Sequence, residues 1–188
     1  MLRALFALFL TIAFDFSGAQ VPIKMWDSCF GGSKLDIVDG VVETPDNGII
    51  LTGVSASNND GSKSQISQGY YDFWVVKADA SGNLVWDKRF GRSDDDGAFD
   101  IQSTIDGNYI VGGYSQSAAN GDKSENSHGN KDFWLVKINP SGDKMWDHCY
   151  GGNKGETLRG AKSTADGGYL LAGYSFSGMS GDKTQANK

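Results

Sequence analysis

The sequence predicts an all-β protein built from tandem units of four short antiparallel strands. The stretch Asp72–Gly91 returns at Asp132–Gly151 with an offset of 60 residues and no gap, so that Trp86 becomes Trp146. Short β-rich runs alternate with Asp-Gly, Asn-Gly and Ser-Gly turns, and no segment shows a helical period of apolar residues. A fixed period of this size is typical of solenoid, propeller and related repeat folds.

Composition limits the class of protein further. The chain of 188 residues is 39% hydrophobic and contains five Trp, which is ample for a packed core. Its 26 Gly and 3 Pro suit a turn-rich β protein. The net charge is −6 and no run of Lys or Arg is present, so nucleic-acid binding, which needs a basic face, is not expected.

The N-terminal stretch Met1–Ala19 has the pattern of a secretory signal peptide. Arg3 precedes an apolar run, Ala4–Phe14, which is too short to span a bilayer. Small residues at Ser17–Ala19 predict cleavage before Gln20, with an uncleaved anchor as the alternative. No later stretch is apolar enough to form a transmembrane segment. We therefore expect export, to the medium or to the outer cell surface.

The first two predicted strands of each copy are defined by a Trp-Asp pair and by a hairpin turn. Residues 20–188 form the repeat region, with copies at 24–83, 84–143 and 144–188, the last one truncated. The first strand ends at a glycine, where the backbone can bend; it covers Lys24–Phe30, Leu84–Phe90 and Lys144–Tyr150. The second strand precedes an Asn-Gly or Asp-Gly turn; it covers Ile37–Thr44, Ala98–Thr104 and Thr157–Thr164.

The third and fourth predicted strands of each copy flank a long polar connection. The third strand contains an interior glycine, which marks the close approach of another backbone. It covers Ile49–Ser55, Tyr109–Ser115 and Tyr169–Ser175, with the glycines at Gly53, Gly113 and Gly173. The connection, Ala56–Tyr71 in the first copy, leads to a fourth strand that we predict to be buried on both faces. Its copies are Asp72–Ala78 and Asp132–Ile138.

Four short antiparallel strands in tandem predict blades of a β-propeller. The 60-residue period exceeds the roughly 40–50 residues usual for a blade, and the long polar connection accounts for the excess. Propellers typically close with about 4–8 blades, whereas the repeat region holds fewer than three copies. We therefore expect an incomplete propeller, either as a fragment of a longer array or closed by self-association.

Several motifs resemble those of known propeller families. The turn at Ser81–Trp86 and its copy at Ser141–Trp146 resemble the Trp-docking repeat of quinoprotein-like propellers, with the preceding Asp79 displaced by one position. A closer resemblance is to secreted repeat proteins of Bacteroidota. It covers residues 24–188 and rests on the motifs Asp72–Lys77, Trp26–Gly32, Asp166–Tyr169 and Gly173–Ser175. The resemblance implies a secreted or surface β-propeller, often followed by a type IX secretion sorting domain, which residues 24–188 do not contain.

The two cysteines are predicted to stay unbridged. Cys29 and Cys149 occupy the same repeat position two periods apart, where the middle copy has Arg89. Equivalent positions in non-adjacent repeats lie beyond the Cα separation of about 7 Å that a disulfide tolerates. Export alone would permit the bond, but the repeat geometry does not.

Recurring acidic residues are the first candidates for chemistry. One set lies in the hairpin turns and another near the start of the second strand; they are Asp46, Asp106 and Asp166, and Asp36, Asp96 and Glu156. Paired carboxylates could act in general acid–base catalysis, but their recurrence in every copy favours hydrogen bonding within turns. The run Asp94–Asp96 lacks the alternate spacing of a calcium loop, so a solvated acidic loop is expected.

The histidines and tryptophans give no stronger sign of a site. His128 and His148 occupy non-equivalent repeat positions without the ligand spacing of a zinc site. The Trp residues could stack on sugars, but because they recur in every copy we assign them to packing between repeats. We therefore predict no catalytic residue, no metal site and no cofactor.

The long polar connections provide the candidate contact surface, because recognition residues often lie on loops over a rigid scaffold. The candidates are Lys63, Asp122, Lys123, Asp182 and Lys183. We predict a non-catalytic binding or scaffold module that presents these loops to a glycan or an extracellular protein. The alternative is a fragment of a propeller enzyme, a quinoprotein-like oxidoreductase or a glycoside hydrolase, with its active site in further blades.

Differences between the copies separate these two functions. An enzyme is expected to show polar positions near the propeller axis that differ between copies on a constant frame. The differences lie mostly in loops and at surface-like strand positions, such as Ser28, Lys88 and His148. This distribution favours the scaffold function.

Overall fold

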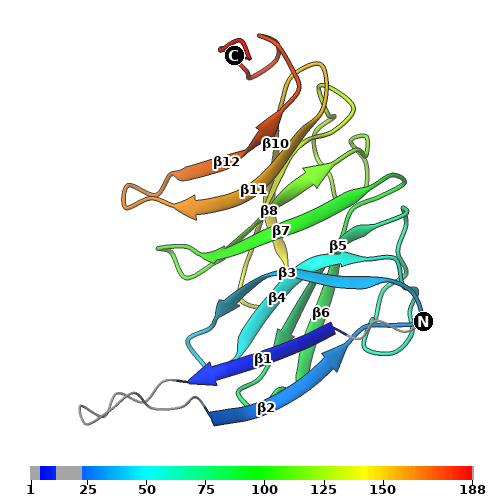
Figure 1. Cartoon of the computed structure of the whole chain (residues 1–188), viewed down its shortest axis with the longest axis vertical. Coiled ribbons are helices and arrows are strands. Elements are labelled where there is room, and N and C mark those ends of the chain that lie inside the picture. Colours follow the sequence, from blue (N-terminus) through cyan, green and yellow to red (C-terminus); the bar gives the residue numbers. More distant parts are fainter. Residues whose placement is uncertain (1–4, 12–22, 188) are drawn as a thin grey trace.

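The structure is a computed structural model that describes residues 5–11 and 23–187, with side chains from Lys24 onward. The described residues form strands and turns and contain no helix (Figure 1). A helix able to cross a membrane is accordingly absent from this part of the chain. The all-β prediction is confirmed. Apart from Leu5–Thr11, the predicted signal peptide lies outside the described residues.

The strands form two complete four-stranded sheets and two pairs, in which all neighbouring strands are antiparallel. The first sheet contains β3 (Asp36–Glu43), β4 (Ile49–Ser55), β5 (Asp72–Ala78) and β6 (Leu84–Phe90) in that order. The second sheet contains β7 (Asp96–Ser103), β8 (Tyr109–Ser115), β9 (Asp132–Ile138) and β10 (Lys144–Tyr150). β11 (Glu156–Ser163) pairs with β12 (Tyr169–Ser175), and β1 (Leu5–Thr11) pairs with β2 (Ile23–Phe30).

The sequence copies and the sheets are out of phase. Each sheet begins with the second predicted strand of one copy and ends with the Trp-Asp strand of the next, so the sheets span residues 36–90 and 96–150. β2 is likewise a Trp-Asp strand. β1 pairs with it in the register that β5 has with β6, because Leu5 faces Phe30 as Phe73 faces Phe90.

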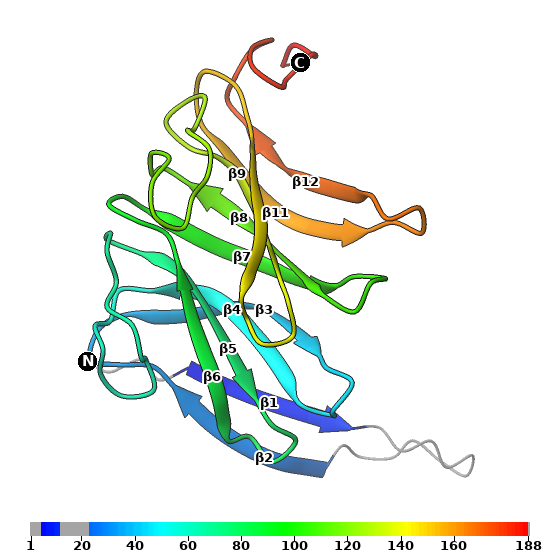
Figure 2. The same ribbon diagram turned by 180° about the vertical axis from the view of Figure 1, so that it is seen from behind.

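The sheets follow one another along the long axis of the molecule, with β1–β2 at one end and β11–β12 at the other (Figures 1 and 2). The first strands of the sheets, β3, β7 and β11, lie beside one another. Two hydrogen bonds join β11 to β7: the Ala161 N–H donates to Asp100 Oδ2 at 2.8 Å and the Ser163 hydroxyl to the Ser103 carbonyl at 3.1 Å. Adjacent sheets are thus fixed along their first strands.

Tryptophan packing supports the predicted structural role. Trp74 and Trp134 are 2% and 0% exposed, so neither can stack on a sugar. The Trp134 ring lies 4.7 Å from the Phe73 ring of the preceding sheet, measured between centroids. The indole N–H of Trp74 donates to Asp87 Oδ2, and that of Trp134 to Asp147 Oδ2, both at 3.0 Å. The aspartate of each Trp-Asp pair therefore satisfies the buried indole of the neighbouring strand.

A β-bulge shapes the first strand of each sheet. In β3, Val38 faces Gly53 and Gly40 faces Thr52, which leaves Asp39 without a partner in the register. A Cβ on Gly53 would lie 1.9 Å from the Ile37 carbonyl oxygen. Gly113 has the same relation to the Gly97 carbonyl oxygen, also at 1.9 Å. The predicted close approach at these interior glycines is confirmed, and the bulge opposite them is its cause.

Gly113→Ala is expected to lower the free energy of unfolding by about 1–3 kcal/mol or more. The added methyl group would overlap backbone atoms of β7, and a change of side-chain rotamer cannot relieve this overlap. Urea denaturation of the purified chain measures the change. Gly178→Ala is the control: no atom lies within 4 Å of a Cβ there, so its effect should stay within about 0.5 kcal/mol. Equal stability of the two variants would contradict the bulge account.

Candidate functional site

The loop lysines among the predicted contact residues point into the protein. Lys63 and Lys123 are each 2% exposed. The Lys63 ammonium donates to Ser67 Oγ at 2.9 Å, and Lys123 donates to the Ser117 carbonyl oxygen at 2.6 Å. The glycine two residues earlier has a positive φ in each loop, 59° and 55°, and this tight turn directs the lysine inward. Both lysines anchor their loops, which removes them from the predicted contact surface.

The remaining loop candidates have mixed environments. Lys183 donates to the Ser177 carbonyl oxygen at 2.9 Å, which repeats the anchoring bond of Lys123. Asp122 pairs with Arg89 at 3.0 Å, and its side chain is 34% exposed. Asp182 is 47% exposed and lies 3.3 Å from the His128 ring. Asp122, Asp182 and Lys183 are thus at least partly accessible, and they lie in two successive connections rather than in one cluster.

The turn carboxylates hold the hairpins to the third strand of their sheet. Lys77 of β5 lies 2.7 Å from Asp46, and Lys137 of β9 lies 2.5 Å from Asp106. The hydrogen bond from each lysine is the main reason that the pKa of each aspartate is well below its usual range. Asp166 accepts the Thr164 hydroxyl and the Gly168 N–H within its own turn. The prediction of turn hydrogen bonding is confirmed.

The second set of carboxylates is buried at the start of the first strands. Asp36, Asp96 and Glu156 are 5%, 0% and 3% exposed. Each accepts the backbone N–H four residues earlier, at 2.8, 2.8 and 2.9 Å respectively. Asp96 is therefore part of the repeated frame, and the expectation of a solvated loop throughout Asp94–Asp96 is wrong for this residue. These carboxylates hold the bends of the chain between sheets through backbone hydrogen bonds.

Asp72 lies next to Asp96 across a glycine. A Cβ on Gly91 would lie 2.4 Å from Asp72 Oδ1 and 2.7 Å from Asp96 Oδ2, so only a glycine fits between the two carboxyl groups. Burial, with a smaller contribution from the Asp96 charge, raises the pKa of Asp72 to about 6. At neutral pH its carboxylate is therefore a cost to folding.

Asp72→Asn is expected to stabilise the protein by roughly 1–2 kcal/mol at neutral pH. The pKa of Asp72 is higher in the folded protein than in the unfolded chain. The wild-type protein therefore becomes more stable as pH falls from about 6 to 4, because the carboxyl group is protonated, and above pH 6 the buried charge lowers its stability. The advantage of the variant should shrink over the same window. Urea unfolding across this pH range measures it, with exposed Asp94→Asn as the control. A gain independent of pH would contradict the assignment.

The bulged residue of each first strand differs in chemistry between the copies. This position is Asp39 in β3, Phe99 in β7 and Arg159 in β11. Asp39 and Arg159 are exposed and Phe99 is half-buried. The frame around the position is constant, since each bulge lies opposite an equivalent glycine. One repeat position thus carries an acid, an aromatic ring and a base.

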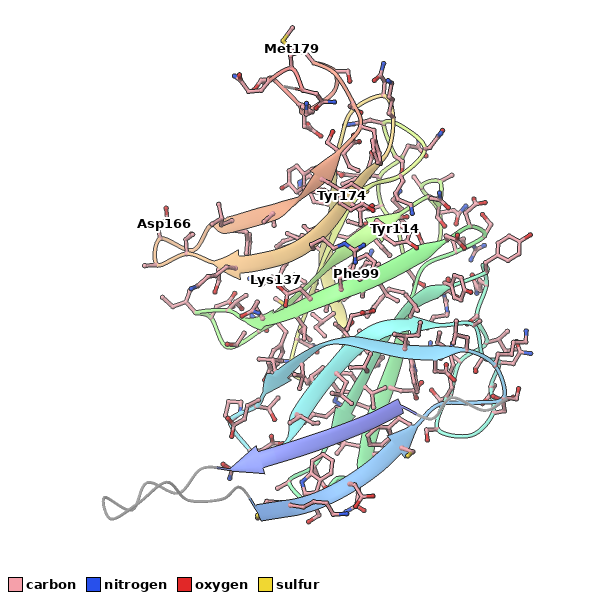
Figure 3. All side chains as sticks on the ribbon, viewed as in Figure 1. Phe99, Tyr114, Lys137, Asp166, Tyr174 and Met179 are labelled. Carbon is pink, nitrogen blue, oxygen red and sulfur yellow. The ribbon has the colours of Figure 1, made fainter. Side chains whose placement is uncertain are left out.

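These side chains are part of a larger group of rings and cations. The Arg159 guanidinium lies 4.1 Å from the centre of the Phe99 ring and 5.8 Å from that of Tyr174. The Tyr114 ring lies 5.6 Å from Phe99 between centroids, and the Lys131 ammonium lies 3.6 Å from the centre of Tyr114. We call Asp39, Phe99, Tyr114, Lys131, Arg159 and Tyr174 the bulge cluster. Figure 3 labels its three aromatic residues, which lie close together on β7, β8 and β12.

A glycine makes room for one ring of the bulge cluster. A Cβ on Gly97 would lie 2.6 Å from Cε1 of Tyr114. The other copies have Ile37 and Thr157 at this position. Tyr114 therefore places the hydroxyl end of its ring close to the backbone of β7, at a position that the other two side chains would occupy.

The pKa values of the two phenols of the bulge cluster shift in opposite directions. Burial raises the pKa of Tyr114 to about 12, and the charges of Asp95 and Asp96 add to the effect. The pKa of Tyr174 is lowered, chiefly by a hydrogen bond with Thr157 and then by Arg159. Burial raises the pKa of Asp39, and the nearby Arg159 charge opposes this shift. The bulge cluster thus combines two cations, one carboxylate and two hydroxyl donors.

The bulge cluster was not predicted from the sequence. The expectation that the copies differ mostly in loops and at surface-like strand positions holds for Asp39 and Arg159, which are exposed, but not for Phe99, which is half-buried. The physical reason is the bulge, which inserts a residue and reverses the alternation of side chains, so the exposed positions of these strands could not be assigned. The one sign in the sequence is that Asp, Phe and Arg occupy the equivalent positions 39, 99 and 159.

Other features of the described residues do not form a second site of this kind. Both cysteines are free, as predicted. A cavity of 280 Å³ lies beside β12, lined by Phe133, Tyr150, Glu156 and Ser175 among others. His148 pairs with Glu125 at 2.8 Å. Residues 24–187 contain no group of three or more His, Cys, Asp or Glu side chains arranged to hold a metal ion.

Comparison with known proteins adds no family to these observations. No protein-family model matches the chain, and no curated protein matches it.

Proposed function

We propose that the chain is a non-catalytic binding module of β-propeller type, secreted or held at the outer cell surface. Its four-stranded antiparallel sheets, with strand order equal to chain order, support a blade assignment. The motif resemblance to secreted Bacteroidota repeat proteins and the pattern of Met1–Ala19 support export. In this proposal β3, β7 and β11 line the propeller axis.

The bulge cluster carries the assignment of binding. Packing alone would keep one residue type at the bulge, as it keeps Trp74 and Trp134 at their equivalent positions. Asp39, Phe99 and Arg159 instead differ in charge and shape at one place on the constant frame. Such a break in symmetry on a rigid scaffold is what a single ligand requires. The anchored polar loops would form the outer rim and present Asp122 and Asp182 to a partner.

The same break in symmetry is the observation that favours the alternative, a fragment of a propeller enzyme. Canonical glycoside hydrolysis uses two carboxyl groups that flank the scissile bond, whereas the bulge cluster contains one, Asp39. The guanidinium of Arg159 and the phenols are donors suited to holding a ligand. The composition of the bulge cluster therefore supports binding over hydrolysis.

A glycan array and an extracellular-protein panel, probed with the purified chain, test the proposal. The double variant Phe99→Ala/Arg159→Ala is expected to lose binding by about tenfold or more, equivalent to about 1.4 kcal/mol. Lys162→Ala, at an exposed position of the same strand, is the control and should bind like wild type. Hydrolase or dehydrogenase turnover that Asp39→Asn abolishes would overturn the non-catalytic assignment, and undiminished binding by the double variant would remove the bulge cluster from the function.

A further inference from the structure

We infer that the bulge cluster binds an acidic sugar, by holding the carboxylate of a uronic acid residue on Arg159 and its ring against the aromatic side chains. This inference rests on the proposed binding function and adds the chemical class of the ligand.

The first step is the uncompensated positive charge. Several cations of the sheets pair with a carboxylate: Lys77 with Asp46, Lys137 with Asp106 and Arg89 with Asp122. Among the described residues, by contrast, no carboxylate forms an ion pair with Arg159 or Lys131. Aromatic rings hold both cations in place instead. Two cations that aromatic rings hold in place, with no carboxylate at ion-pair distance, can bind an anion.

The second step is the geometry of Arg159. Its guanidinium lies 4.1 Å from the centre of the Phe99 ring, a distance at which the ring face occupies one flat side of the group. A stacked guanidinium keeps its N–H edge, which matches the two oxygens of a carboxylate in a planar, bidentate contact. A carboxylate is therefore the group that Arg159 is placed to bind.

The third step distinguishes a sugar acid from an acidic peptide. Asp39 occupies the bulge of β3, the strand beside β7, and the Arg159 charge opposes the rise in its pKa that burial causes. Its carboxylate can accept hydrogen bonds from sugar hydroxyls, which an acidic peptide of Asp or Glu side chains does not offer. Tyr174 is 45% exposed and provides a ring face for the C–H groups of a pyranose together with a hydroxyl donor. A uronic acid has the carboxylate, the hydroxyls and the apolar face together.

The fourth step is preorganisation. The bulges fix the backbone at Asp39, Phe99 and Arg159, and Gly97 leaves space for the Tyr114 ring to pack beside Phe99. A site whose side chains are already ordered loses less conformational entropy when it binds a ligand.

Calorimetric titration of the full chain with oligogalacturonate, and separately with its methyl ester, tests the inference. The ester keeps the ring and hydroxyls and removes the charge, so we expect it to bind at least about tenfold more weakly. Arg159→Gln should reduce the affinity for the acid by a similar factor, and Lys162→Gln should leave it unchanged. Arg159→Lys keeps the charge but loses the bidentate edge, and we expect an intermediate loss; circular dichroism confirms that each variant is folded.

The outcomes separate this inference from the proposed function. Equal binding of the acid and the ester would overturn the carboxylate assignment, as would a polyglutamate peptide that competes as well as the sugar acid. If neither sugar binds while the Phe99→Ala/Arg159→Ala variant still loses another glycan or a protein partner, the inference fails and the binding function stands. If the double variant loses no ligand at all, both fail.

Discussion

The buried indole of the third strand is the group on which each sheet depends. An indole N–H removed from water requires an acceptor, and in both complete sheets that acceptor is the aspartate of the following Trp-Asp strand. The same carboxylate oxygen accepts a backbone N–H from the long connection, at 3.0 Å from Ser64 and 2.9 Å from Ser124. One oxygen atom thus joins the third strand, the fourth strand and the loop, so the loop has a fixed path over its sheet.

Local patterns predicted the elements but not their grouping. The third and fourth strands of each sequence copy, which are β4, β8 and β12 and then β5 and β9, were predicted at their observed limits. Asp-Gly turns and interior glycines are local signals that mark these limits. Leu84–Phe90 completes the sheet of the preceding copy through the short turn that joins β5 to β6, and the repeat period alone leaves open to which sheet a strand belongs. The inward position of Lys63 was equally hidden, since its burial depends on a turn and on acceptors such as Ser67 rather than on its own character.

The candidate site escaped prediction for a related reason. Trp74 and Asp87 are recognisable because their roles recur, whereas a ligand site is defined by what does not recur. Asp39, Phe99 and Arg159 became visible as a group only when the bulge gave them a common position and the neighbouring first strands brought them together. The sequence shows the chemical type of each of these residues, but their exposure and their proximity depend on the β-bulges.

The phase difference between copies and sheets has a consequence for how such an array changes over generations. Because each sheet combines strands from two successive copies, recombination that inserts or removes one 60-residue period regenerates complete sheets wherever the crossover falls. The indole–carboxylate bond and the contact between first strands are restored at the new junction. Genes of this type can therefore lengthen or shorten by whole units at little cost, while the bulged positions acquire new side chains one at a time.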